Sequence, residues 1–480
     1  MPQKVKNADR RSGKNQGLRP PHVLHRTTFS TSRTMDFFSE KELVTQTGHA
    51  RSEWPLVFLK ECIDNSLDAC DEANIVPVIT VKCDAGGIEV SDNGPGLPEA
   101  TLERQKDFTV RASNREAYQA PDRGAQGNAI KTLLPMPSII DPAGGKLVIE
   151  AHGKRHSIRC RADHVTQRPM VDDEATTATT TGTRVRMEWS PQTTEDAAVW
   201  PFDRKWASNS PQATRLVHDL VLGFTLFNPH ATVSLDWFGD QTTFAATDAA
   251  FSKWRPCQPT SAHWYDTAQL ERLVGAYITH DRDTGNDRLV SDFLSEFDGF
   301  AGSAKRTAVL TAAGLKRSKL SELVAGGDFN HKAVEELLQA MQANAKPVSS
   351  KRLGMIGEDH LRQRFVEIGC DPASITYRKS LAREGKPHVV EVVFGQFIDE
   401  QTPRHLFTGA NWSAAIKNAF RSFGATGEGL EGLLVQQEVW GNQPVAMAVH
   451  LAAPHVRYTD RGKTSIVVDD VNETEDQDDE

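Results

Sequence analysis

The sequence predicts an α+β fold, and three observations support this class. A long amphipathic helix is expected at residues 54–73, followed by pairs of β-rich runs joined by glycine-containing turns between 76 and 189. Helical periodicity then dominates from about residue 261 to 345, before strand signals return beyond 385. Helices and antiparallel strands that are segregated along a chain are typical of α+β proteins.

Length and composition predict an ordinary water-soluble chain of two to four domains. The chain has 480 residues, of which 38% are hydrophobic and 25% charged, and no apolar run is long enough to cross a bilayer. No apolar signal segment occurs near residue 1, and the six scattered cysteines form no C-x-x-C pair. We therefore expect a protein of the reducing cytoplasm without a structural zinc or a disulfide framework.

The two ends carry opposite charge within a formal net charge of −9. Residues 1–34 hold eight Lys or Arg and one acid, Asp9, whereas residues 469–480 hold eight acids. Both segments are predicted to be disordered tails. The basic tail is expected either to contact phosphate or to act only as a solubilising segment, with a transit peptide as a weaker alternative.

The first functional signal is the polar face of the predicted helix, WPLVFLKECIDNSLDACDEA. Glu61, Asn65 and Asp68 stand at i, i+4 and i+7 and therefore share one side. Another side is apolar and spaced for burial: Leu59, Ile63 and Leu67. A solvated polar stripe is the simple alternative, so this helix indicates a site only if other segments supply matching groups.

A hairpin with a glycine-rich end is predicted next, at residues 76–97. The runs ITVKC and GIEVSD are joined by Asp-Ala-Gly-Gly, and SDNGPGL follows. Gly94 and Gly96 permit backbone conformations that let a ligand approach the main chain, and Asp92 can accept a hydrogen bond from an exocyclic amine such as that of adenine. A plain Asp-Asn-Gly turn is the alternative.

A glycine pair and further strand signals follow. Residues 108–126 lack apolar periodicity and are interpreted as a mobile loop. DRGAQGNAIKTLL then places Gly124 and Gly127 before an apolar helix, where exposed N–H groups form an anion site. The pattern is neither a Walker loop nor a Rossmann fingerprint. A hairpin turned at His-Gly-Lys is predicted at 146–162, and a strand at 181–189 that begins with the Thr-Gly-Thr containing Thr183.

The remainder is predicted to be a helical region followed by a mixed one. Helical patterns run through DTAQLERLVGAY, DRLVSDFLSEFDGF, AKRTAVLTAAGL and NHKAVEELLQAMQANA. A break rich in Pro and Ser, KPVSSKRLGMIGE, precedes strand and helix signals in HVVEVVFGQF, NWSAAIKNAFRSF and PVAMAVHLAAPHVRYT.

Taken in order, these motifs resemble the Bergerat (GHKL) ATP-binding fold. The order is Glu-x-x-x-Asn, Asp-x-Gly-x-Gly, a Gly-x-x-Gly loop and Thr-Gly-Thr. This arrangement is shared by type II topoisomerase ATPases, mismatch-repair MutL proteins, heat-shock chaperones and sensor histidine kinases. The resemblance implies a sandwich of antiparallel or mixed sheet and helices that binds ATP with Mg²⁺.

The same resemblance implies roles for individual residues. Asn65 would ligate Mg²⁺ and Glu61 would act as general base on the attacking water. Asp92 would read adenine with support from Thr183, and the backbone amides of residues 124–127 would wrap the phosphates. The role of Asp68 stays open between support for these groups and a helix–loop contact. The implied nucleotide-binding residues are Asn65, Asp68, Asp92, Gly94, Gly96, Gly124, Ala125, Gln126, Gly127, Asn128 and Thr183. Ala129 replaces the third glycine of the family loop and, as the smallest substitute, is expected to preserve binding.

Within this superfamily the chain resembles the B subunits of type IIB topoisomerases, the topoisomerase VI class, over about residues 33–468. A helix and a strand of those subunits resemble KECIDNSLDA and TLFNPHATVSLDW. Their helix–two-turns–helix insert resembles the stretch from QLERLV to GMIGEDHL, and the end of their transducer resembles AVHLAAPHVRYTDRGKTSI. The implied order is a basic tail at 1–34, an ATP-binding domain with an N-terminal strap at 35–255, a helix–two-turns–helix domain at 256–350, an α/β transducer of the ribosomal S5-like type at 351–468, and an acidic tail at 469–480.

The resemblance also implies how such a chain would act. Lys463 would touch the γ-phosphate and join Glu61 as a catalytic residue, and two copies would form a homodimer while ATP is bound. The predicted function is the ATP-hydrolysing subunit of a type IIB topoisomerase, a gate that controls double-strand DNA passage. An ATP-gated clamp or switch without strand passage is the alternative, and the helical insert disfavours a MutL-like repair ATPase.

Three expectations concern partners. Basic residues of the helical region are expected to contact the backbone of double-stranded DNA, with a solvated face as the alternative: Lys305, Arg306, Lys316, Arg317, Lys319, Lys346, Lys351 and Arg352. Strand cleavage would need a separate topoisomerase VI A-like subunit, and the chain would lie in the cytoplasm with the nucleoid. The family holds that subunit with a long helical stem, whereas mostly acidic residues follow Lys463 here. We therefore expect docking through another surface or the acidic tail, or no cleavage subunit at all.

Overall fold

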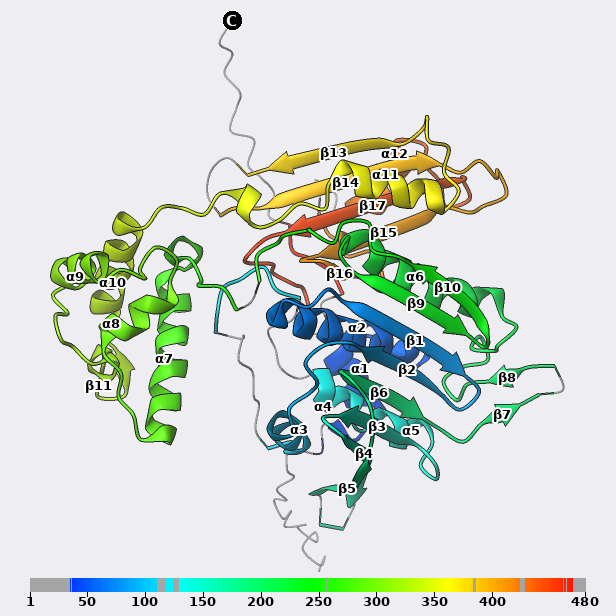
Figure 1. Ribbon diagram of the computed structural model, residues 1–480, viewed down its shortest axis with the longest axis horizontal. Helices are drawn as coiled ribbons and strands as arrows, with labels where there is room; N and C mark the ends of the chain where they lie inside the picture. The colour runs from blue at the N-terminus through cyan, green and yellow to red at the C-terminus, as the bar shows by residue number, and fades with distance from the viewer. Residues whose placement is uncertain are drawn as a thin grey trace, which may run out of the picture.

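Two mixed sheets with helices between and around them make up the computed structural model, and the α+β class predicted from the sequence is confirmed (Figure 1). The structure describes residues 35, 37–109, 117–123, 129–163, 165–166, 168–194, 196–255, 257–382, 386–423, 428–460, 462 and 464–468. Within these ranges, no helix has the length and apolar character needed to span a membrane.

The larger sheet has eight strands in the order β10-β9-β1-β2-β6-β3-β4-β5, with β1 and β9 parallel and the other described neighbours antiparallel. β1 with β2 and β3 with β4 are the two predicted hairpins, the second turned at His152 and Gly153. The strands are β1 (Val78–Asp84), β2 (Gly87–Asp92), β3 (Lys146–Ala151), β4 (Lys154–Asp163), β5 (Arg168–Thr177), β6 (Thr183–Glu188), β9 (Thr232–Trp237) and β10 (Asp240–Phe244).

Several helices accompany this sheet, and a small β7–β8 ladder extends from it. They are α1 (Glu40–Thr47), α2 (Trp54–Ala73), α3 (Glu99–Lys106), α4 (Ala129–Leu133), α5 (Met136–Ile140) and α6 (Pro211–Phe227), with β7 (Gln192–Thr193) and β8 (Ala198–Val199). The described parts of the predicted loop, residues 108–109 and 117–123, contain no helix or strand; residues 110–116 and 124–126 lie outside the described ranges.

Among the elements of this half that were not predicted are β5 and α6. β5, RPMVDDEATT, is polar and mostly exposed, so it lacks the apolar alternation that marks a half-buried strand. α6 begins after Ser210, whose hydroxyl accepts a hydrogen bond from the Ala213 N–H, and Pro211 occupies its first position. This capping pattern is a readable helix signal at the sequence level.

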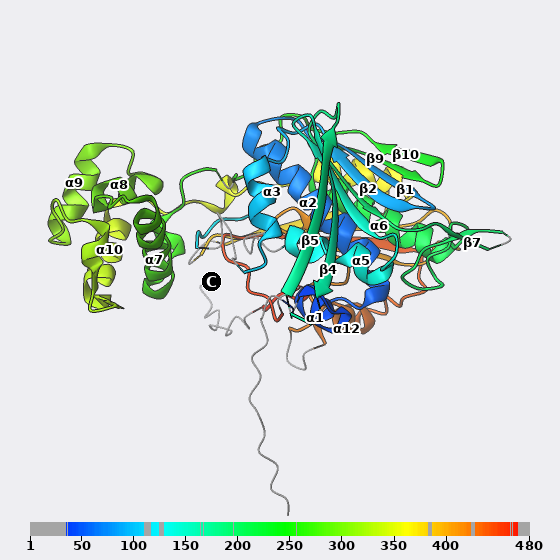
Figure 2. The same ribbon diagram turned by 90° about the horizontal axis from the view of Figure 1, so that it is seen from below.

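A separate group of helices stands to one side of both sheets, as Figures 1 and 2 show, and it matches the helical region predicted from the sequence. Its first long helix starts at a capping box formed by Asp266 and Gln269. The elements are α7 (Thr267–Thr284), α8 (Val290–Phe293), α9 (Ser303–Ala312), β11 (Val324–Ala325), β12 (Asp328–Phe329) and α10 (His331–Asn344).

The C-terminal sheet has five strands in the order β13-β14-β17-β15-β16, with β15 parallel to β17. The segment NWSAAIKNAFRSF contributes only the short strand β16 and no helix to this region. The elements are α11 (Glu358–Glu367), β13 (Thr376–Leu381), β14 (Val389–Gln396), β15 (His405–Ala410), β16 (Ser413–Ala414), α12 (Gly429–Gln436) and β17 (Val445–Ala452).

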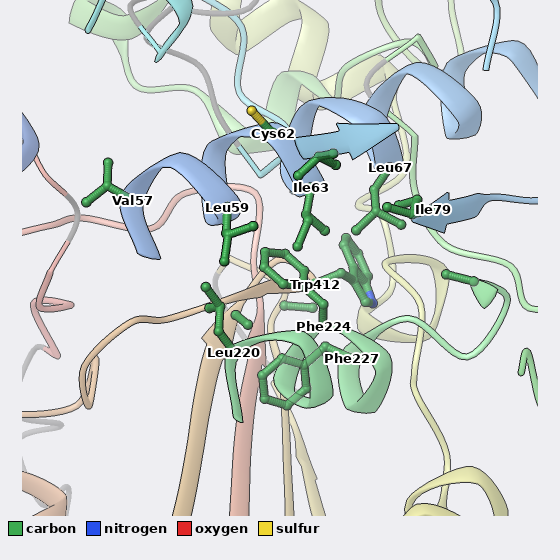
Figure 3. Close-up of a cluster of buried hydrophobic side chains, with 14 of the residues drawn as sticks. Val57, Leu59, Cys62, Ile63, Leu67, Ile79, Leu220, Phe224, Phe227 and Trp412 are labelled. Carbon is green, nitrogen blue, oxygen red and sulfur yellow. The ribbon is translucent and has the colours of Figure 1, made fainter. Parts of the chain in front are cut away.

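Helices α2 and α6 lie between the two sheets and form the centre of the core. α2 packs on β1 and β2, while α6 contacts β9 as well as β15 and β16. In Figure 3 the apolar side of α2, including Ile63 and Leu67, faces α6, and Trp412 of the C-terminal region points into the same cluster near Phe224. This packing fixes the polar side of α2 relative to both sheets, because close-packed interiors resist rotation of a helix.

Candidate nucleotide-binding site

Helix α2 places its predicted polar residues in two different surroundings. Asn65 is exposed and lines a cavity, and Glu61 lies one turn earlier and is partly exposed. Asp68 is only 5% exposed and accepts a hydrogen bond from Arg123 Nη1 at 2.6 Å. A solvated stripe therefore does not describe Asp68, and its carboxylate makes the helix–loop contact that the sequence left open.

The cavity beside α2 has a volume of about 490 Å³, within the usual range for small-molecule sites. Its walls are mostly apolar and come from α2, β3, β6, α4 and the loop after β2: Cys62, Ala69, Ala73, Pro95, Leu97, Pro98, Ile130, Leu133, Leu147, Ile149 and Val185. The polar lining consists of Asn65, Ser66, Glu72, Asp92, His152 and Thr183. An apolar enclosure with a few convergent polar groups suits a flat heteroaromatic ring.

Asp92 is a buried carboxylate in the lining of this cavity. Ser66 Oγ donates to its Oδ2 at 2.9 Å, and the backbone N–H groups of Gly94 and Thr183 donate to its Oδ1 at 2.9 and 3.1 Å. The contact from Gly94 is that of an Asx turn, so the turn predicted as the alternative is present as well. These three donors hold the 8% exposed carboxylate in a defined orientation.

Glycines allow the backbone to pass close to Asp92. A Cβ on Gly182 would lie 2.0 Å from the main-chain oxygen of Asp92, and Gly182 itself has a φ of +73°. The central glycine of Thr-Gly-Thr is therefore required for Thr183 to reach the carboxylate. Gly96, with a φ of +90°, also lines the cavity and lies next to His152 and Gly182.

The predicted phosphate-binding residues fall outside the described part of the chain. This applies to Gly124, Ala125, Gln126, Gly127 and Asn128, and also to Lys463. The helix predicted after the glycine pair is present as α4, which starts at Ala129 and brings Ile130 and Leu133 to the cavity wall. On the C-terminal side, Gly462 packs against the backbone of Thr47 and Gly48 at the end of α1.

A second polar group lies on the far side of α2, and we call it the polar junction: Asp68, Asp71, Arg123, Asn228, His230 and Lys253. Arg123, which is 4% exposed, donates to Asp68, to Asp71 Oδ2 at 2.8 Å and to the side-chain oxygen of Asn228. Lys253 Nζ lies 2.8 Å from Asp71 Oδ2, and His230 Nε2 lies 2.8 Å from Asp71 Oδ1. Two buried cations thus face two buried carboxylates immediately before the predicted phosphate loop.

Burial and charge set the protonation of the polar junction. Burial by itself raises the pKa of Asp71, but the charges of Arg123 and Lys253 outweigh it and hold that pKa far below the ordinary value. Burial and the neighbouring Arg123 lower the pKa of Lys253 to about 8. Burial also lowers the pKa of His230, so its neutral ring donates from Nε2 to Asp71.

Sequence reasoning missed several of these groups. Ser66 sits beside Asn65 in the motif but carries no signal of its own. The polar junction draws on residues 71, 123, 228–230 and 253, which no local pattern connects. The Asn-Pro-His of TLFNPHATVSLDW was noted only as the start of a strand, and two of its three residues reach the junction.

The basic residues of the helical region are mostly exposed. Lys305, Lys316, Lys346 and Lys351 are exposed, while Lys319 pairs with Asp287 at 3.2 Å and Arg352 with Asp298 at 2.8 Å. Such an arrangement suits a contact with a phosphate backbone and a solvated face equally well. The DNA contact therefore stays a prediction.

The residues present fit a magnesium nucleotide. The cavity accepts a purine in size, Asp92 supplies an oriented carboxylate, and the exposed Asn65 supplies an amide oxygen of the kind Mg²⁺ prefers. The neighbouring stretch 124–128 begins directly after the anchored Arg123.

Comparison with known proteins gives a match over most of the chain. The B subunit of type 2 DNA topoisomerase 6 from Methanococcoides burtonii is 24% identical over 441 residues, covering 87% of this chain and 65% of that protein. The corresponding subunit from Pyrococcus horikoshii is 39% identical over 135 residues, covering 25% of this chain and 23% of that protein. The chain thus spans less than two thirds of the length of these relatives. No protein-family model matches it.

Solved structures overlap the chain only loosely. The B subunit of DNA gyrase from Myxococcus xanthus covers 91% of this chain and 89% of its own, with a TM-score of 0.35 and 12% identity. The ATPase domain of MutL from Aquifex aeolicus covers 83% and 89%, with a TM-score of 0.31 and 11% identity. On the evidence of the long sequence match, the chain is a distant homologue of the B subunits of type 2 DNA topoisomerase 6.

Proposed function

We propose that the chain binds ATP with Mg²⁺ in the cavity beside α2 and hydrolyses it. The observation that carries this proposal is Asp92, a buried carboxylate that accepts three hydrogen bonds and lines a mostly apolar cavity, together with the exposed Asn65 in the same lining. The carboxylate accepts a hydrogen bond from the exocyclic amine of adenine, while the apolar walls cover the ring. Ser66 and Thr183 keep the carboxylate oriented toward the ring.

The remaining residues of the predicted site act on the phosphate end. Asn65 holds the metal through its amide oxygen; a bound Mg²⁺ neutralises phosphate charge. Glu61, one helical turn away, orients a water molecule and takes its proton. In this proposal the backbone amides of residues 124–127 bind the phosphates, and the ammonium of Lys463 pairs with the γ-phosphate. Together these groups distinguish ATP from ADP.

We further propose that hydrolysis controls a dimeric gate for double-stranded DNA, in a type IIB topoisomerase that also contains a separate cleavage subunit. The homology to B subunits of type 2 DNA topoisomerase 6 supports this assignment, as does a separate helical region that follows the first sheet. In this proposal residues 35–255 bind ATP, the exposed basic residues of 256–350 contact DNA, and residues 351–468 transmit the conformational change that hydrolysis causes.

Relaxation of supercoiled DNA tests the whole proposal. The purified chain is assayed with ATP and Mg²⁺, alone and with the product of the adjacent gene, and ATP turnover is recorded in parallel. We expect DNA-dependent ATP turnover in both samples and relaxation only with the second protein. ATP turnover without relaxation in either sample would favour an ATP-gated clamp, and the absence of turnover would reject the ATPase assignment.

A further inference from the structure

The turn between β15 and β16, residues 411–413, is the place where the C-terminal sheet touches both parts of the candidate site. Asn411 and Trp412 have φ angles of 49° and 64°, which makes this a tight left-handed turn. All three residues are at most 8% exposed. We refer to Asn411, Trp412 and Ser413 as the coupling turn.

The coupling turn binds the residues that lead into the predicted phosphate loop. Asn411 Nδ2 donates to the carbonyl oxygen of Asp122 at 3.2 Å, and its Oδ1 accepts from the Ala453 N–H at 2.9 Å. The carbonyl oxygen of Trp412 accepts from Asn228 Nδ2 at 2.8 Å and lies 3.5 Å from Arg123 Nε. The last two described residues before position 124 are therefore tied to the C-terminal sheet.

The same turn also binds the helix that carries Glu61. Ser413 Oγ donates to Asp64 Oδ2 at 2.7 Å, and Lys60 Nζ donates to the same oxygen at 2.6 Å and contacts the Ser413 hydroxyl. Lys60 and Asp64 flank Glu61 on α2. A shift of the C-terminal sheet relative to α2 would break these buried polar contacts, and unpaired buried polar groups are costly.

We propose that the coupling turn is a positioning element for hydrolysis: it sets the C-terminal sheet relative to the helix that carries Glu61 and to Asp122 and Arg123, which precede the predicted phosphate loop in the sequence. This inference rests on the proposed ATPase function and deepens it. None of the three residues lines the cavity, so they act on the arrangement of the catalytic groups rather than on nucleotide contact. Loss of the turn's side-chain contacts should therefore lower kcat while leaving the binding of ATP and ADP intact.

Two variants of the full chain test this proposal. Asn411→Gly removes the amide and keeps a residue that tolerates positive φ, and Ser413→Ala removes only the hydroxyl. Asn74→Gly is the matched control, because Asn74 also has positive φ (56°) and loses one side-chain contact, with Arg255 Nη1 at 2.8 Å, away from the coupling turn. Steady-state ATP hydrolysis gives kcat and KM, calorimetry gives the Kd for ADP, and thermal melting reports folding.

We expect kcat to fall about tenfold in both coupling-turn variants, with KM and the Kd for ADP within about threefold of the wild type and Asn74→Gly unchanged. An unaltered kcat, a rise in KM alone, or an equal loss in the control would overturn the inference while leaving the ATPase assignment in place. If the wild type itself does not hydrolyse ATP, the proposed function fails first and the inference falls with it. If Asn411→Gly unfolds at a lower temperature than the wild type, Ser413→Ala alone tests the inference: its kcat should fall while its KM and its Kd for ADP stay unchanged.

Discussion

The cavity and the polar junction lie on two sides of helix α2. The first is an open, mostly apolar space, and the second is a cluster of paired, buried charges. The cavity has a volume of about 490 Å³, its walls are mostly apolar, and its lining includes one oriented carboxylate, Asp92. In the junction the charged groups are paired directly: Arg123 is hydrogen-bonded to Asp68 and Asp71, and Lys253 pairs with Asp71. Helix α2 supplies groups to both.

This difference predicts how substitutions in the two regions should affect the protein. Groups that face an open cavity act on a ligand, so substituting them should alter binding or turnover more than folding. Groups paired inside the chain hold segments together, so removing one leaves its partner charged and buried, which is strongly destabilising. This contrast would be contradicted by a cavity variant that mainly lowers stability, or by a junction variant that leaves stability unchanged.

The largest effect is expected from Glu61→Ala, which removes the proposed general base. Loss of a general base should reduce ATP turnover by about 10²–10⁴-fold while nucleotide binding is retained. A coupled phosphate-release assay measures ATP turnover. Glu336→Ala on α10 is the control, because Glu336 is a half-exposed acid outside the candidate site. Near-wild-type turnover would remove Glu61 from its assigned role.

A comparably large effect, but on stability, is expected from Arg123→Gln. The substitution leaves Asp68 without the guanidinium that it binds in the described structure and weakens the charge balance around Asp71, so the free energy of unfolding should fall by about 3–5 kcal/mol. Denaturant unfolding measures this change. Arg161→Gln is the control, because its ion pair with Asp172 is about half exposed and should contribute less than about 1 kcal/mol. Equal changes in the two variants would contradict the contrast drawn here.

A smaller effect is expected from pH, through Lys253. Its pKa is about 8 in the folded chain against an ordinary value of 10.5, so between these values the unfolded chain binds more protons and the contribution of Lys253 to stability rises with pH. Comparing the unfolding free energy of the wild type with that of Lys253→Met from pH 7 to 10 isolates this contribution. The wild type should gain relative to the variant as pH increases; a constant difference would mean that Lys253 titrates normally.

The same contrast explains what the sequence could predict. Glu61, Asn65, Asp92 and Thr183 stand in short motifs whose spacing indicates a helix face, a strand end and a strand start. The fold class was therefore predictable, and Asn65, Asp92 and Thr183 do line one cavity; their roles and that of Glu61 stay predictions. The polar junction was not predictable, because Arg123 finds its partners 52 to 55 positions earlier on α2 and 105 positions later. β5 escaped prediction for a different reason: as an exposed strand it needs no apolar alternation.

The central claim is that the cavity recognises adenine through the carboxylate of Asp92. The most direct test is calorimetric titration of the wild type and Asp92→Asn with non-hydrolysable analogues of ATP and GTP. A carboxylate accepts from the amine of adenine but repels the carbonyl oxygen of guanine, so the wild type should bind the ATP analogue at least about tenfold more tightly, and the variant should lose that preference. Equal affinity of the wild type for both analogues, or an unchanged preference in the variant, would contradict the account.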